Sequence, residues 1–176
     1  RGKFLNAGQT CIAPDYVLVE DSVHDALVDK IKAAITEFYG DDPRQSADYA
    51  RIVNAAHFHR LEKLLDSGTV AAGGVADADE RYLAPTVLTD VDADSAAMAD
   101  EIFGPVLPVL RVASLQEAIA FVNERDKPLA LYVFSERDAE TGAVVDATSS
   151  GGVCVNGTIF HVSNPDLPFG GVGPSG

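Results

Sequence analysis

Cys11 and Cys154 are the side chains of this sequence best suited to act as nucleophiles. Cys11 lies in "NAGQTCIAPDY" and Cys154 lies inside the apolar run "GGVCVN". A thiol is a stronger nucleophile than a hydroxyl, and the small residues Ala7 and Gly8 leave room for a substrate above the sulfur of Cys11. A neighbouring backbone N–H can help to hold a developing oxyanion. This context alone leaves Cys11 open between a nucleophile and a packed apolar side chain, and it favours packing for Cys154.

The spacing of the cysteines and histidines in the sequence favours neither a disulfide nor a metal site. The two cysteines are far apart in a sequence without secretory features, so we expect reduced thiols in the cytoplasm. His57 and His59 form an H-x-H pair, but residues two apart on a helix point to different sides. The sequence therefore predicts no metal site.

The glycine-rich end of the chain resembles a nucleotide-binding motif only in its letters. Gly171-Val-Gly173-Pro-Ser-Gly176 matches G-x-G-x-x-G, yet no strand directly precedes it and Pro174 lies where the helix would begin. We therefore expect residues 157–176 to form a long glycine-rich loop that faces substrate or cofactor.

Strand-like and helix-like segments alternate along the chain and would have to position these residues. Apolar, β-branched runs predict strands, and apolar residues at helical spacing between capping residues and glycines predict helices. The predicted strands are 16–20, 69–74, 83–91, 105–113, 129–136 and 151–156, and the predicted helices begin at Ser22, before Phe58, at Ser114 and at 137, with a polar loop over 73–82. This alternation predicts one α/β domain over residues 1–176, with three α/β/α layers and a largely parallel sheet.

Charge limits the partners of this domain. The sequence has 27 acidic and 13 basic residues, for a formal net charge of -14, and the acids are scattered. A nucleic acid or an anionic membrane needs a basic face, so we expect neither as a partner. No 18-residue apolar run or signal-peptide core is present, so we expect a soluble protein.

Three separate stretches together resemble the aldehyde dehydrogenase superfamily: "NAGQTC" (6–11), "EIFGPVLPV" (101–109) and "LPFGGVGPSG" (167–176). Their order and spacing extend the resemblance over nearly the whole chain. The combination of "GQTCIAPDYVL", "EFYG" and "LPFGGVGPSG" is most similar to the class 3 branch, which oxidises aliphatic and aromatic aldehydes with NAD or NADP.

The resemblance implies a role for six residues. Cys11 would attack the aldehyde to give a thiohemiacetal, hydride would pass to the nicotinamide, and water would hydrolyse the resulting thioester. Glu101 would bind the nicotinamide ribose, Phe103 would pack near the nicotinamide ring, and His57 would lie near the cofactor. Asn156 and Phe169 would line the substrate pocket. Without the resemblance, Glu101 is a surface acid and Phe103 a core aromatic residue.

The resemblance also implies that further parts lie outside these residues. The general base in an E-L-G-G-K motif, an asparagine that binds the oxyanion and the coenzyme-binding domain would all precede Cys11. A strand that builds a homodimer would lie partly beyond Gly176. We therefore expect an engineered or proteolytic piece of a longer protein, inactive by itself. The alternatives are a non-catalytic module, or a relative that passes the acyl group to coenzyme A or phosphate.

Overall fold

The computed structural model describes all residues, 1–176, and divides them into two compact units. Unit 1 comprises Arg1–Arg111 and unit 2 comprises Val112–Gly176. Each unit is described separately.

Unit 1 is built on a four-stranded sheet with the strand order β1-β6-β5-β2. Strands β5 and β6 are parallel, with Thr86 opposite Val106, whereas β2 runs antiparallel to β5 at the edge. Strands β3 and β4, which lie between β2 and β5 in sequence, form a separate two-stranded antiparallel sheet. The strands are β1 (Val17–Glu20), β2 (Thr69–Ala72), β3 (Ala76–Asp77), β4 (Tyr82–Leu83), β5 (Thr86–Thr89) and β6 (Val106–Val112).

The helices of unit 1 begin and end at residues suited to those positions. Gly40, with φ of 79°, ends α1, as expected of a residue that adopts positive φ without strain. The Asn54 side chain accepts a hydrogen bond from the N–H of His57 (2.8 Å) and so caps α2. The helices are α1 (His24–Tyr39), α2 (Ala55–Lys63) and α3 (Ala96–Ala99), with short 3-10 turns η1 (Leu5–Gly8), η2 (Asp21–Val23), η3 (Pro43–Gln45) and η4 (Leu64–Ser67).

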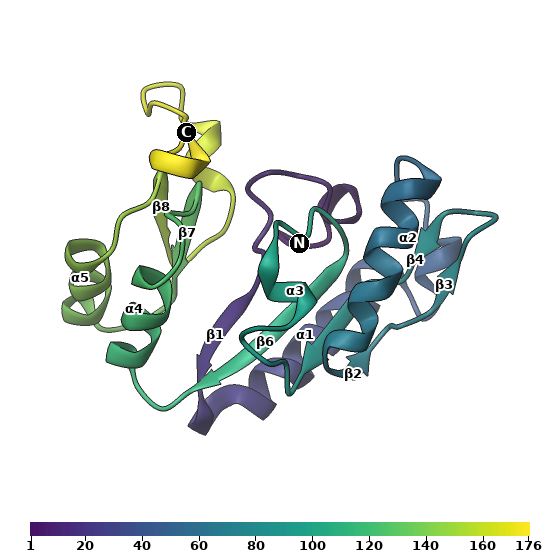
Figure 1. Ribbon diagram of the computed structural model, residues 1–176, viewed down its shortest axis with the longest axis horizontal. Coiled ribbons are helices and arrows are strands. Elements are labelled where there is room, and N and C mark those ends of the chain that lie inside the picture. Colours follow the sequence, from purple (N-terminus) through teal and green to yellow (C-terminus); the bar gives the residue numbers. More distant parts are fainter. The chain divides into compact units, whose positions relative to one another are not determined.

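The hydrophobic core of unit 1 extends over both faces of its two central strands, β5 and β6. Every residue of β5 is buried, as is every residue of β6 except Arg111. Strand residues alternate between the two faces, so full burial requires cover on each side. Figure 1 shows α1 behind this sheet and α3 in front of it.

Unit 2 is a strand–helix–strand arrangement followed by a long loop. Strands β7 (Ala130–Val133) and β8 (Gly152–Val155) pair in parallel, with α5 (Asp138–Ala147) between them in sequence and α4 (Leu115–Asn123) before them. Ser114 caps α4 by accepting from the N–H of Glu117 (3.2 Å). Residues 157–176 contain only the 3-10 turns η5 (Phe160–Ser163) and η6 (Gly173–Ser175).

The α/β class with a largely parallel sheet is confirmed, whereas two local predictions need correction and one short helix was missed. The predicted polar loop 73–82 contains β3 and the first residue of β4, and α3 was not predicted. The predicted cap at Ser22 is wrong because η2 precedes α1, whose N-cap residue is Val23. These elements are too short for a periodic pattern to identify.

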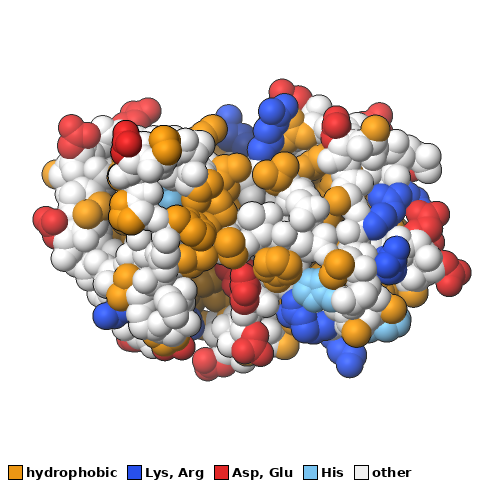
Figure 2. Space-filling model, turned by 90° about the horizontal axis from the view of Figure 1, so that it is seen from above, with side chains coloured by type: hydrophobic (Ala, Val, Ile, Leu, Met, Phe, Trp, Pro, Cys, Tyr) orange, Lys and Arg blue, Asp and Glu red, His pale blue; other side chains and the backbone are white.

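Acidic side chains are distributed over the face seen in Figure 2 and do not gather in one patch. No helix combines the length and the apolar composition needed to span a bilayer. No group of three or more His, Cys, Asp or Glu side chains is arranged to hold a metal ion.

Candidate active site

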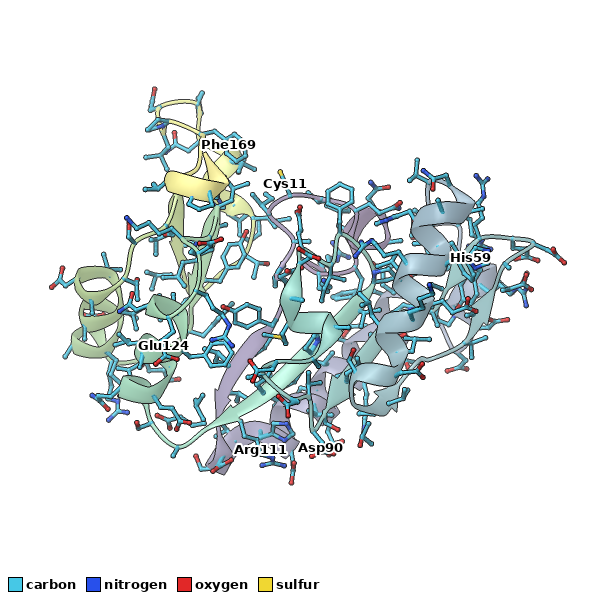
Figure 3. The ribbon with its side chains drawn as sticks, in the orientation of Figure 1. Cys11, His59, Asp90, Arg111, Glu124 and Phe169 are labelled. Atoms are coloured by element: carbon cyan, nitrogen blue, oxygen red, sulfur yellow. The ribbon has the colours of Figure 1, made fainter.

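Cys11 lies at the corner of a tight turn in unit 1. The carbonyl of Thr10 accepts a hydrogen bond from the N–H of Ala13 (3.0 Å), so Cys11 and Ile12 are the central residues of the turn. Ile12 is buried and anchors the turn, whereas Cys11 is exposed. Figure 3 shows the Cys11 side chain pointing away from its loop. The thiol is therefore accessible to a small molecule.

The backbone that leads to Cys11 adopts an unusual conformation. Asn6, Ala7 and Gly8 have φ values of 51°, 51° and 73° in succession. The left-handed region is unfavourable for L-residues other than glycine, and it persists only where the surroundings enforce it. A Cβ atom at Gly8 would lie 2.2 Å from the carbonyl oxygen of Gly104. Glycine at position 8 thus lets the loop that carries Cys11 pack directly on the backbone of Gly104 and Pro105.

Gln9 joins the Cys11 loop to a segment more than forty residues away. Its side-chain nitrogen donates to the carbonyls of Asn6 (3.0 Å) and Arg51 (3.1 Å), and its side-chain oxygen accepts from the N–H of Val53 (2.9 Å). Both ends of the amide are therefore used, which fixes its orientation. Gln9 therefore links the turn of Cys11 to the segment that contains Arg51 and Val53.

The segment Glu101–Phe103 carries the two residues predicted to contact a cofactor. Glu101 is exposed, Ile102 is fully buried, and Phe103 is half-buried with a φ of 48°. The side chain of Glu101 therefore faces solvent, whereas that of Ile102 faces the core. An exposed carboxylate beside a half-buried phenyl ring is chemically suited to bind a ribose diol and to pack against a nicotinamide ring.

Helix α2 meets this segment through His57 and Arg60. His57 lies with its Nε2 atom 2.7 Å from the carbonyl oxygen of Phe103, and Arg60 Nε donates to His57 Nδ1 (3.4 Å). A carbonyl can only accept, so Nε2 carries the proton and Nδ1 accepts from Arg60. Both ring nitrogens of His57 are therefore engaged with protein atoms. His59 instead contacts Glu62 (3.3 Å), so the H-x-H pair faces two different partners.

A group of four charged residues lies around Ile102: Lys3, Asp15, Arg60 and Glu101. Lys3 is only 6% exposed, and burial lowers its pKa to about 8, against the attraction of Asp15 and Glu101. Burial also raises the pKa of Asp15, although Lys3, the N–H of Ile102 and Arg60 all oppose this rise. Burial and the neighbouring Asp15 raise the pKa of Glu101, whereas Arg60 and Lys3 lower it.

The six predicted site residues divide between the two units. Cys11, His57, Glu101 and Phe103 lie in unit 1, and Asn156 and Phe169 lie in unit 2. Asn156, with φ of 54°, uses its amide oxygen to accept from the N–H of Ser135 (3.0 Å) and its amide nitrogen to donate to the carbonyl of Ser135 (3.0 Å). It thereby joins the ends of β7 and β8. Phe169 is 61% exposed, and Cys154 is half-buried in β8.

Sequence reasoning did not identify Gln9, Asp15 and Arg60 as part of this arrangement. Arg60 follows His57 by three residues on a predicted helix, and that spacing places both on one face. Nothing in the sequence pairs Asp15 with Ile102, because that contact joins two loops that are far apart along the chain.

A sequence profile of the aldehyde dehydrogenase family matches residues 1–176. The chain belongs to the aldehyde dehydrogenase family.

Its relatives include enzymes of the class 3 branch. A mouse protein named "Aldehyde dehydrogenase, dimeric NADP-preferring" is 54% identical over 175 residues, which cover 99% of this chain and 39% of that protein. The mouse "Aldehyde dehydrogenase family 3 member A2" is also 54% identical, over 99% of this chain and 36% of that protein. The resemblance to class 3 aldehyde dehydrogenases is thus confirmed, and this chain spans about two fifths of the length of these relatives.

A solved aldehyde dehydrogenase structure has the same fold. The substrate-bound state of Staphylococcus aureus AldH matches with a TM-score of 0.97 and 53% sequence identity, over 99% of this chain and 38% of that chain. The fold of this chain is therefore that of the matching part of an aldehyde dehydrogenase.

Proposed function

We propose that Cys11 is the nucleophile of an NAD(P)-dependent aldehyde dehydrogenase that oxidises aliphatic or aromatic aldehydes to carboxylic acids. The observation that carries this proposal is the exposed thiol at the corner of a turn, held by the hydrogen bonds of Gln9 and packed through Gly8 on the backbone of Gly104, directly after Glu101–Phe103. Membership of the aldehyde dehydrogenase family supports the reaction class. The name of the mouse relative, which prefers NADP, supports a nicotinamide cofactor.

The chemistry of Cys11 follows from its exposure. Its thiolate attacks the aldehyde carbon, a C–S bond forms, and the carbonyl oxygen becomes the hydroxyl of a thiohemiacetal. A bound NAD(P) would supply the hydride acceptor for that carbon, and the hydroxyl proton is released to water in the same step. The product on Cys11 is a thioester, and attack by water breaks the C–S bond to release the carboxylic acid and the thiol. A rigid turn keeps the sulfur in one place through these steps, which raises the fraction of productive encounters.

Glu101 and Phe103 are the proposed cofactor residues of this chain. The exposed carboxylate of Glu101 accepts from the ribose hydroxyls, and the ring of Phe103 limits the movement of the nicotinamide. Burial and the nearby Asp15 raise the pKa of Glu101, whereas the charges of Arg60 and Lys3 oppose this rise and so favour the carboxylate form that accepts hydrogen bonds. His57 acts through its bond to the Phe103 carbonyl, and its direct contact with cofactor stays a prediction.

Asn156 and Phe169 are proposed as residues that line the aldehyde pocket. Phe169 offers an exposed aromatic surface for an apolar aldehyde chain. Asn156 sits at the end of β8 with its amide held by Ser135, so its orientation is fixed. We also propose a homodimer, because the mouse relative is named dimeric.

The test compares two cysteine variants in the protein that carries this chain. We expect Cys11→Ser to reduce NAD(P)H formation from an aldehyde by about a thousandfold or more, since it removes the attacking thiolate. Cys154→Ser serves as the matched control and should retain activity within about twofold. Full activity of Cys11→Ser would contradict the proposal. A product that appears only with coenzyme A or phosphate would instead identify a relative with another acyl acceptor.

A further inference from the structure

Side chains from outside the segment hold the backbone of Glu101–Phe103 at successive positions. Arg60 donates to the carbonyls of Glu101 (3.4 Å) and Ile102, and His57 donates to the carbonyl of Phe103 (2.7 Å). Asp15 accepts from the N–H of Ile102 (3.0 Å). Loop backbone is usually bonded to its own neighbours or to water, so this arrangement fixes the segment from two directions.

The backbone of this segment needs such support. Phe103 has a φ of 48°, in the left-handed region that costs a non-glycine residue on the order of 1–3 kcal/mol. The conformation persists only if the surrounding contacts outweigh that cost. The conformation also determines where the Phe103 ring and the Glu101 carboxylate lie.

Asp15 differs from His57 and Arg60 in its origin. The latter two belong to helix α2, whereas Asp15 follows Cys11 by four residues in the same loop. Its hydrogen bond to Ile102 therefore connects the backbone beside the nucleophile to the backbone beside the proposed cofactor residues. The charged groups that face Asp15 are Lys3 and Arg60, which favour its carboxylate form, and the like charge of Glu101.

We propose that Asp15 is a positioning residue that sets the placement of Glu101 and Phe103 relative to Cys11 through its hydrogen bond to the N–H of Ile102. The inference rests on the proposed function, since it concerns the geometry of hydride transfer from a substrate bound to Cys11. Asp15 itself contacts neither substrate nor cofactor in this account.

Three variants separate the hydrogen bond from the charge. Asp15→Ala removes both, whereas Asp15→Asn keeps an oxygen that can accept from Ile102 and removes only the charge. Asp92→Ala is the matched control, because the Asp92 carboxylate also accepts from a backbone N–H, that of Asp94 (2.8 Å), in an exposed loop. If Asp15→Ala does not fold, Asp15→Leu takes its place as an isosteric side chain without an acceptor.

The first readout is amide hydrogen exchange of residues 101–104 without cofactor. We expect the N–H of Ile102 to be protected in the unmodified protein and to exchange about tenfold faster in Asp15→Ala, but not in Asp15→Asn or Asp92→Ala. An Ile102 amide that exchanges as fast as a solvent-exposed one in the unmodified protein would overturn the proposal without any variant.

The second readout is the split between kcat and the KM for the aldehyde in the protein that carries this chain. Asp15→Ala should lower kcat for hydride transfer by about tenfold or more and change KM for the aldehyde little, and Asp15→Asn should restore kcat to within about threefold. Equal losses in the alanine and asparagine variants, or no loss in either, would refute the role of Asp15. Persistent activity of Cys11→Ser would refute the proposed function instead, so the two failures are distinguishable.

Discussion

Two glycine-containing loops carry the proposed chemistry of this chain, and they are held in different ways. The loop around Cys11 is fixed by contacts with residues far away in sequence: Gln9 with Arg51 and Val53, Asp15 with Ile102, and Gly8 with Gly104. In the loop 164–176, hydrogen bonds such as Leu167 to Asn164 and Val172 to Ser175 join residues three positions apart, and a close backbone approach of Gly170 to Gly151 reaches farther along the chain.

This difference indicates which loop needs a single conformation. A nucleophile must stay within a fraction of an ångström of its reacting geometry, and long-range contacts with a packed unit provide that restraint. The loop 164–176, which is proposed to line the aldehyde pocket with the exposed Phe169, is expected to adapt to substrates of different shape. Substitutions that remove restraint should therefore have large effects near Cys11 and small effects near Phe169.

The largest difference is expected between two glycine substitutions. Gly8→Ala forces a side chain into the left-handed region and places its Cβ 2.2 Å from the carbonyl of Gly104. We expect it to reduce the free energy of unfolding by about 4 kcal/mol. Gly170→Ala meets open space and should change that free energy by about 0.5 kcal/mol or less. Urea denaturation measures both, and equal effects would show that the two loops are restrained alike.

Gln9 should have the next largest effect. Gln9→Ala removes hydrogen bonds to Arg51 and Val53, so the turn of Cys11 loosens, and kcat of the protein that carries this chain should fall about a hundredfold. Asn164→Ala removes a bond from the N–H of Asp166 (3.0 Å) in the other loop and should lower kcat by about twofold at most. Steady-state kinetics with one aldehyde decides between them. A larger loss from Asn164→Ala would reverse the comparison.

A smaller, pH-dependent effect is expected from the buried Lys3. Its pKa is lowered to about 8 in the folded protein from 10.5, so the unfolded chain holds the proton to higher pH. The contribution of Lys3 to the free energy of unfolding is therefore fully present above pH 10.5 and is lost as the pH falls through 8. Between pH 7 and pH 10, the free energy of unfolding should therefore rise by roughly 2 kcal/mol because of Lys3.

Thermal or urea unfolding as a function of pH measures the effect of Lys3. Lys3→Met should lack the rise, and Lys127→Met, which changes an exposed lysine of unit 2, should keep it. Burial raises the pKa values of Tyr39 and Tyr49, which opposes the rise near pH 10 equally in all three proteins. Parallel curves for Lys3→Met and the unmodified protein would show that the folded protein does not lower the pKa of Lys3.

The sequence was informative where local patterns determine structure. Apolar runs predicted the strands that became β1, β5, β6 and β8, and Gly40 and Ser114 marked helix ends because capping depends on the residue itself. The motifs around Cys11 and Glu101 predicted the family, and the family profile confirmed it. The candidate site residues that the sequence identified lie in motifs whose residue types suit a chemical role.

The sequence was uninformative where a residue acts through a distant partner. Nothing in "QTCIAPD" shows that Gln9 bonds to Arg51 or that Asp15 bonds to Ile102, since the fold alone brings these atoms together. The resemblance places His57 near the cofactor, and only the structure shows that its ring nitrogens bond to Phe103 and Arg60. Such positioning roles become visible only from hydrogen-bond partners.

The most direct test of the central proposal locates the acyl group during turnover. The protein that carries this chain is mixed with an aldehyde and NAD(P), quenched in acid within a single turnover, digested and examined by mass spectrometry. We expect the mass of the acyl group on the peptide that contains Cys11 and on no peptide that contains Cys154. Formation of NAD(P)H with an unmodified Cys11 peptide, or with the acyl group on Cys154, would contradict the proposal.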